Sequence, residues 1–248
     1  MTWPTLKRPP IKEAVFDLKF KEGHNLTQEG IKDFCDSMKD VFPAVNEIFI
    51  LQMQAKLEKG EHQNVQSSRQ VNGYKLSDEK RSFIVQIRLD GFTLSKVEPY
   101  ISWDELNREA RPVLEKLALA FPELYFKRAA LRYINHFDLR FDEPINSYFN
   151  ILPIFPVELP QLVDSFFVRL VVPQKEPVVL KSIIQLGIEP IGVSDDHYKV
   201  IFDIDVYRES EYSINKLDVL FSEFDHIRSF KNQIFFTGLT EKTLANFN

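Results

Sequence analysis

Apolar and polar residues alternate strictly over residues 13–20, near the start of the chain. The apolar members of this run are Ala14, Phe16, Leu18 and Phe20. Successive side chains on a strand point to opposite faces, so the alternation predicts a strand with one buried face. A similar alternation over residues 128–141 predicts a second such strand, which opens the second half of the chain.

These two strands share a short sequence pattern. Residues 16–20 read Phe-Asp-Leu-Lys-Phe, and residues 137–141 read Phe-Asp-Leu-Arg-Phe. In both halves a helical pattern, several strand patterns and a long helical pattern follow. This shared order predicts one fold unit used twice, over residues 1–124 and 125–248. The alternative is a single continuous domain with one antiparallel sheet and no repeat.

Helical spacing of apolar residues predicts two long helices. Ser102 and Glu105 have the spacing of a capping box, which predicts that the first of these helices starts there. Pro112 lies inside its apolar stripe and predicts either a kink or a later start. The second long helix is predicted over residues 214–230, and residues 233–236 are predicted to form a last strand.

The segments between the helices alternate like strands and are separated by polar turns. Further strands are predicted over residues 47–57, 69–76, 83–89, 92–97, 165–172, 178–188 and 197–207. Asp90-Gly91 is a typical hairpin-turn pair, and three prolines in residues 152–160 predict a rigid connector. We therefore expect an α+β fold with antiparallel sheets and packed helices. It would consist of two β-α-β(3–4)-α units in a saddle-like or helix-grip-like arrangement.

Composition narrows the class of protein. The chain has 248 residues, of which 44% are hydrophobic and 27% charged, as in ordinary soluble domains. Its net charge of −5 disfavours a dedicated nucleic-acid binder. Cys35 is the only cysteine, which excludes a disulfide framework and a cysteine-based zinc site. Neither a signal peptide nor a membrane-spanning run is recognisable, so we expect a cytoplasmic protein.

Basic and polar side chains gather on one face of the strand predicted over residues 128–141. Arg132 and His136 lie on this face, and Arg88 faces the same way on another predicted strand. Such a face can bind an anion, or its arginines can pair with acidic residues across strands. Asn135 interrupts the apolar face, where a buried amide either fixes local structure or lines a pocket. These four residues are the predicted ligand- or partner-binding set.

Asp203 and Asp205 flank one apolar residue on a predicted strand and therefore point the same way. Two carboxylates at this spacing could hold Mg²⁺ or Ca²⁺, and the alternative is a solvated strand face. The histidines lack the spacing of a zinc site, and the sequence contains no nucleophile elbow or glycine-rich phosphate loop. No catalytic set is recognisable, and no cofactor is expected.

Several motifs together resemble a sporadically distributed family of uncharacterised bacterial proteins of about this length. The motifs are PIKEAVF at 10–16, DGFTLS at 90–95, PYISW at 99–103, LRYIN at 131–135, DIDV at 203–206 and LTE at 239–241. The resemblance implies a bacterial, cytoplasmic, single-chain protein. A patchy distribution is typical of defence or toxin–antitoxin systems. The resemblance implies no catalytic residue.

The sequence therefore favours a non-enzymatic binding protein. Its polar sheet face would contact a protein partner or a small anionic ligand, and a homodimer is compatible with this reading. Two alternatives remain open. One is a divalent-metal-dependent enzyme that uses Asp203 and Asp205. The other is a carrier that holds a small ligand in an apolar cavity between the sheet and the helix over residues 103–120.

Overall fold

A nine-stranded antiparallel sheet dominates the part of the chain that the computed structural model describes, residues 3–56, 64–140, 143–152, 165–188 and 197–248. The strands lie in the order β2-β3-β4-β5-β1-β6-β9-β8-β7. They are β1 (Ile11–Phe20), β2 (Ala44–Lys56), β3 (Asn64–Ser77), β4 (Phe83–Arg88), β5 (Gly91–Val97), β6 (Tyr125–Arg140), β7 (Phe167–Gln174), β8 (Leu180–Ile188) and β9 (His197–Ser213). The helices are α1 (Gln28–Asp36), α2 (Trp103–Ala120), α3 (Leu217–Gly238) and α4 (Glu241–Ala245), with a 3-10 turn over Ile145–Ser147.

The prediction of an α+β fold built from two β-α-β(3–4)-α units is wrong, because strands from both halves of the chain form this one sheet, which dominates the structure. β1 and β6, which open the two halves, lie side by side in its middle, where Phe16 pairs with Leu131. The strands of the first half continue outward from β1, and those of the second half continue outward from β6. This pairing gives hydrogen-bond partners to the backbone N–H and C=O groups along one edge of each central strand. The same groups would lack strand partners if the two halves formed separate sheets.

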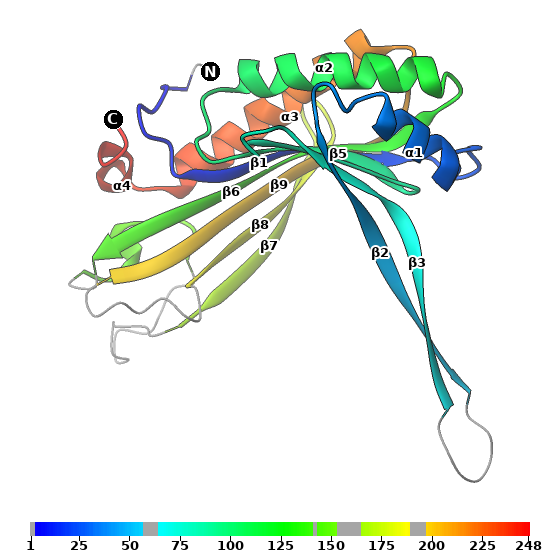
Figure 1. Ribbon diagram of the computed structural model, residues 1–248. Helices are drawn as coiled ribbons and strands as arrows, with labels where there is room; N and C mark the ends of the chain where they lie inside the picture. Colours follow the sequence, from blue (N-terminus) through cyan, green and yellow to red (C-terminus); the bar gives the residue numbers. More distant parts are fainter. Residues whose placement is uncertain (1–2, 57–63, 141–142, 153–164, 189–196) are drawn as a thin grey trace.

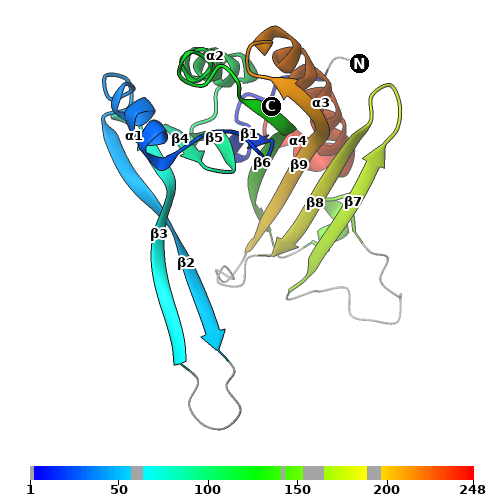
Figure 2. The same ribbon diagram turned by 90° about the vertical axis from the view of Figure 1, so that its right-hand side faces the viewer.

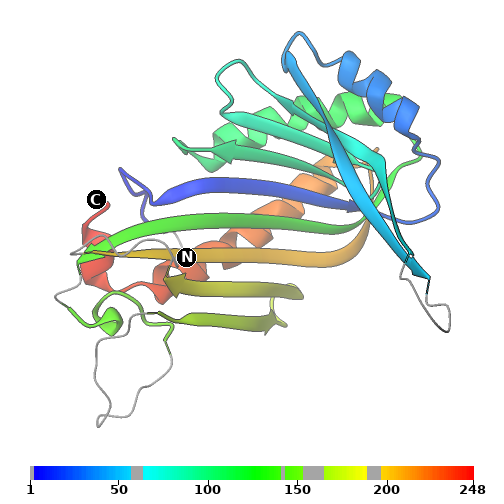
Figure 3. The same cartoon turned by 60° about the horizontal axis from the view of Figure 1, so that its bottom comes forward.

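The sheet is strongly bent, with α2 and α3 on one face (Figure 1). The hairpin of β2 and β3 extends away from the body as an arm, and β7, β8 and β9 curve away on the other side (Figures 1 and 2). No helix of the described residues lies on the opposite face of the central strands (Figure 3). The molecule therefore has a helix-bearing side and a helix-free side, and each carries a different kind of polar site.

The core lies between the sheet and the two long helices. Phe16 and Leu18 on β1 are fully buried, as their alternation predicts. The Phe16 ring stacks on Phe224 of α3, with 3.9 Å between the ring centroids. Burying an aromatic side chain of this size contributes roughly 1.5–3 kcal/mol, so the contact fixes α3 against the central strand.

Several local predictions are confirmed. Ser102 caps α2, because its Oγ accepts a hydrogen bond from the Glu105 backbone N–H at 3.1 Å. α2 runs without interruption through Pro112, so the later start is wrong. A tight turn joins β4 to β5, but it lies one residue earlier than predicted: its residues are Leu89 and Asp90, and Gly91 already pairs with Arg88 as the first residue of β5. A Cβ on Gly91 would lie 2.6 Å from the Leu18 carbonyl oxygen.

The end of the second long helix differs from its prediction. α3 continues to Gly238, so the strand predicted over residues 233–236 is wrong. Ile234 and Phe235 remain on the buried stripe of the helix, and this packing outweighs their preference for strands. Most of the predicted connector, over residues 153–160, lies outside the described residues. None of the described helices combines the length and the apolar character needed to cross a bilayer.

Candidate functional site

Three of the four residues predicted to bind a ligand or partner lie on the helix-free face: Arg88, Arg132 and His136. Arg132 on β6 binds Asp203 on β9 through two atoms. Its Nε lies 2.9 Å from Oδ1, and its Nη2 lies 2.6 Å from Oδ2. Asp203 is almost fully buried, and the bidentate, charge-assisted contact satisfies both of its oxygens. Arg132 is thus engaged in cross-strand pairing, and its part in binding stays a prediction.

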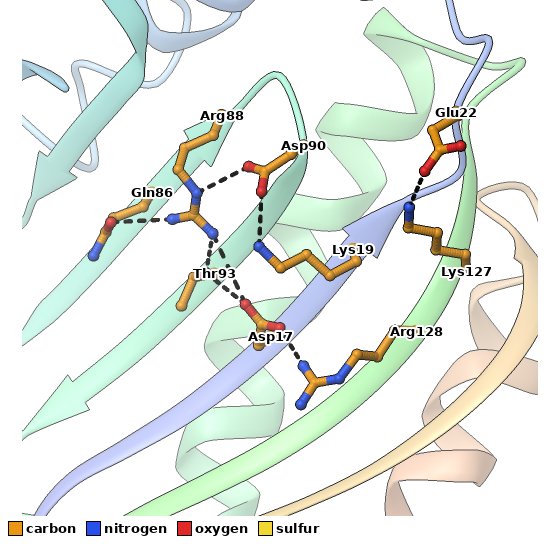
Figure 4. A network of polar contacts seen from close by, with 9 residues as sticks. All are labelled: Asp17, Lys19, Glu22, Gln86, Arg88, Asp90, Thr93, Lys127 and Arg128. Carbon is orange, nitrogen blue, oxygen red and sulfur yellow. Dashed lines mark hydrogen bonds and ion pairs between the residues drawn. The ribbon is translucent and has the colours of Figure 1, made fainter. Parts of the chain in front are cut away.

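Arg88 belongs to a wider network centred on Asp17 (Figure 4). Arg128 donates to Asp17 at 2.8 Å from one side, and Thr93 donates to it at 3.0 Å from the other. Arg88 donates in turn to Thr93 and to Gln86, both at 3.1 Å. The network therefore links β4, β5, β1 and β6, four neighbouring strands of the sheet.

Asp203 and Asp205, the predicted metal ligands, both face arginines. Arg128 contacts Asp205 Oδ2 at 2.8 Å, while Asp205 Oδ1 is buried without a hydrogen-bond partner among the described residues. Burial raises the pKa of Asp205, and Arg128 acts in the opposite direction. A cation here would have to displace two guanidinium groups. In the described ranges, no group of three or more His, Cys, Asp and Glu side chains could hold a metal ion.

His136 lies farther along β6, on the same face. Its backbone N–H donates to the carbonyl oxygen of Pro10, the residue just before the start of β1, at 2.9 Å. Its half-buried side chain lines a cavity of about 350 Å³ together with Lys12, Asp138 and Lys199. The structure therefore separates His136 from the Arg88 network instead of bringing all the predicted residues together.

The helix-bearing side contains a different site, a pocket of about 230 Å³. It lies where α3, the start of α2 and β6 meet, and the chain over residues 3–9 borders it. The lining residues that carry charged, polar or aromatic groups include Tyr100, Trp103, Asp104, Tyr133, Asn135, Arg228 and Lys231. Ligand pockets are usually roughly 300–1,000 Å³, so this one suits a compact small molecule.

Lys231 is the unusual member of this pocket. It is only 7% exposed, and no carboxylate of the described residues forms an ion pair with it. Its Nζ instead lies 3.8 Å from the centre of the Tyr133 ring, in a cation–π contact. Burial, aided by the nearby Arg228 charge, lowers the pKa of Lys231 to about 7. Part of the lysine population is therefore uncharged at neutral pH.

Two tyrosines and an asparagine complete the polar lining. The hydroxyl groups of Tyr100 and Tyr133 lie 3.1 Å apart and share a hydrogen bond. Burial raises the pKa of Tyr100 to about 12, so its hydroxyl keeps its proton at neutral pH. Asn135 donates to the carbonyl oxygens of Tyr133 and Phe202 at 3.2 and 2.9 Å. Its buried Oδ1 has no partner in the described part of the chain, so it can accept a hydrogen bond from a ligand.

The border of the pocket is formed by the N-terminal chain. The Trp3 ring stacks on Phe236 of α3, with ring centroids 5.2 Å apart and an angle of 4° between the planes. Farther along, the Arg8 backbone N–H donates to the Phe247 carbonyl oxygen at 3.1 Å. These contacts attach the segment to α3 and to the chain that follows α4.

Asn135 was predicted as a binding residue, but Lys231 was missed. The predicted helix stopped at residue 230, one residue short of it. The buried positions of α3 include Phe224, Ile227 and Lys231, which follow each other at spacings of three and four. Continuing that stripe by one step would have placed a lysine on a buried face, a signal that was present in the sequence.

No family model matches the chain, and no curated protein matches it either.

Proposed function

We propose that the protein binds a small anionic molecule in the pocket around Lys231. The observation that carries this proposal is a buried lysine beside Arg228, with no ion pair to either from the described residues. Transferring an ammonium group from water into a protein interior costs several kcal/mol, so buried charges are normally paired. An anion in the pocket would supply the missing counter-charge.

The remaining lining groups narrow the kind of ligand that the pocket can bind. Tyr100 provides a protonated hydroxyl, and Asn135 provides an unused acceptor. The aromatic ring of Trp103 supplies an apolar wall. The pocket therefore suits a compact molecule with an anionic group at one end and a hydrogen-bond donor or acceptor at the other.

The test compares the purified protein with two variants. Lys231→Met removes the buried charge, whereas Lys116→Met removes an exposed lysine of α2 outside the pocket. We expect phosphate, acetate or succinate to raise the melting temperature of the wild type and of Lys116→Met, but not of Lys231→Met. Calorimetric titration should show the same loss of binding. If none of these anions binds, or Lys231→Met binds equally well, the proposal is wrong.

A protein partner on the helix-free face is a second candidate. The observation that favours it is a hollow of about 290 Å³ over the central strands, beside the charged network. Arg132 lines this hollow and is 47% exposed although its partner Asp203 is buried. A photo-crosslinking residue at Ile134 in the hollow should trap a partner that the same residue at exposed Leu119 does not. Identical crosslinks at both positions would argue against this face.

A further inference from the structure

Lys231 has the surroundings of a nucleophilic amine. A lysine amine attacks only when it is uncharged, and burial or a neighbouring cation brings this about. Lys231 has both, because it is buried and Arg228 lies one helical turn before it on α3. No hydrogen bond or ion pair from the described residues occupies its Nζ. The amine is therefore available to a molecule in the pocket.

Arg228 offers a second point of attachment. It also lines the pocket, and its guanidinium carbon lies 5.9 Å from the Trp103 ring centre without an ion pair in the described residues. A guanidinium group in such a position binds a carboxylate through paired hydrogen bonds. Residues three apart on a helix share a face. A ligand with a carboxylate next to a reactive carbon would therefore reach both side chains.

We infer that Lys231 captures a small oxo acid by forming an imine with its carbonyl group, while Arg228 holds the carboxylate. This inference rests on the proposed anion pocket and names its ligand class. The Nζ lone pair forms a bond to the carbonyl carbon, and a proton from the amine moves to the carbonyl oxygen, which becomes a hydroxyl group. The second amine proton balances the proton that this hydroxyl group takes up when it leaves. The carbon–oxygen bond then breaks, the oxygen leaves as water, and a carbon–nitrogen double bond remains. No electron donor or acceptor is needed.

The hydrogen-bonded tyrosines suit the water-forming step. The leaving oxygen needs a proton, and the Tyr100 and Tyr133 hydroxyls both line the pocket in their protonated form. One hydroxyl donates its proton to the leaving oxygen, and the second proton of the amine returns to the hydrogen-bonded pair, so both tyrosines end the step protonated. Both therefore act as positioned proton donors beside the amine.

The experiment traps the imine. The purified protein is incubated with glyoxylate or pyruvate and then with sodium cyanoborohydride, which reduces an imine to a stable secondary amine. We expect a mass increase on the intact protein that peptide mapping assigns to Lys231. Lys231→Arg keeps the charge but cannot form the imine, so it should show no such adduct. Adducts spread over exposed lysines, with none at Lys231, would overturn the inference.

A parallel titration separates this inference from the proposed function. Lactate and acetate carry the carboxylate but no ketone or aldehyde carbonyl, so they test the anion pocket alone. If they bind and pyruvate and glyoxylate leave no adduct on Lys231, the pocket stands and imine formation is refuted. If neither lactate nor acetate binds and Lys231 carries no adduct, both are refuted. Arg228→Met should weaken lactate binding and reduce trapping of pyruvate together.

Discussion

On the helix-free face of the sheet, Arg88, Arg128 and Arg132 each contact a carboxylate. On the helix-bearing side, Lys231 and Arg228 contact aromatic rings and no carboxylate of the described residues. The paired arginines join neighbouring strands, so their charges are used within the fold. The unpaired cations of the pocket lower the stability of the protein without a ligand. This arrangement is expected where a bound ligand supplies the missing counter-charge.

Removing Arg128 should have the largest effect. Arg128 contacts Asp17 and Asp205, and each of the three side chains is 20% exposed or less. Arg128→Met would leave two carboxylates close together without their shared cation, and we expect a loss of roughly 3 kcal/mol of unfolding free energy. Urea denaturation measures the change. Lys127→Met is the matched control, because among the described residues Lys127 pairs only with the exposed Glu22.

The Lys127→Met control separates the effect of a buried ion pair from that of an exposed one. An exposed pair contributes about 0–1 kcal/mol, so Lys127→Met should leave the midpoint of unfolding almost unchanged. Equal losses of unfolding free energy in Arg128→Met and Lys127→Met would contradict a structural role for the arginine–carboxylate pairs of the helix-free face.

Lys231→Met should stabilise the folded protein, whereas Arg128→Met should destabilise it. The pKa of Lys231 is about 7 in the folded protein and close to 10.5 when unfolded. Between these values the unfolded chain binds more protons, so the wild type gains stability as pH rises through this window. Below pH 7 the full cost of the buried ammonium is present. We expect Lys231→Met to be more stable there by roughly 1–4 kcal/mol, and the difference to shrink towards pH 10.

Unfolding measured from pH 6 to pH 10 without added anions checks this expectation. The charged and titratable groups around the pocket are Asp104, Arg228, Tyr100 and Tyr133. The two tyrosines stay neutral over most of this range, because the pKa values of both are raised. A destabilised Lys231→Met variant at pH 6 would show that the lysine supports the fold.

Apart from the Lys127→Met control, Trp3→Ala should have the smallest effect on stability. Trp3 stacks on Phe236 at the border of the pocket, and an aromatic pair contributes about 0.5–1.5 kcal/mol beyond its buried area. We expect the unfolding free energy to fall by about 1 kcal/mol and bound anions to dissociate faster. Stopped-flow dissociation measures the second effect. An unchanged dissociation rate would mean that Trp3 does not restrict access to Lys231.

The sequence predicted the features that depend on neighbouring residues. The alternation over residues 13–20 and the cap at Ser102 are local, and both are confirmed. The pairing of β1 with β6 brings together distant segments, and no local pattern specifies which strand edges meet. The same limit applies to Arg132. Its strand face was predicted, but its partner Asp203 depends on β9 lying next to β6.

The central position of β1 and β6 also has a consequence for how the chain folds. Phe16 and Leu131 are paired although about 115 residues separate them, and pairings of such high contact order form slowly. During synthesis β1 can pair with β5 well before β6 is complete. The edge of β1 that will later pair with β6 then remains open. An open apolar strand invites pairing with other chains. We therefore expect the yield of refolded protein to fall steeply as the protein concentration rises, because other chains can pair with this edge before β6 covers it.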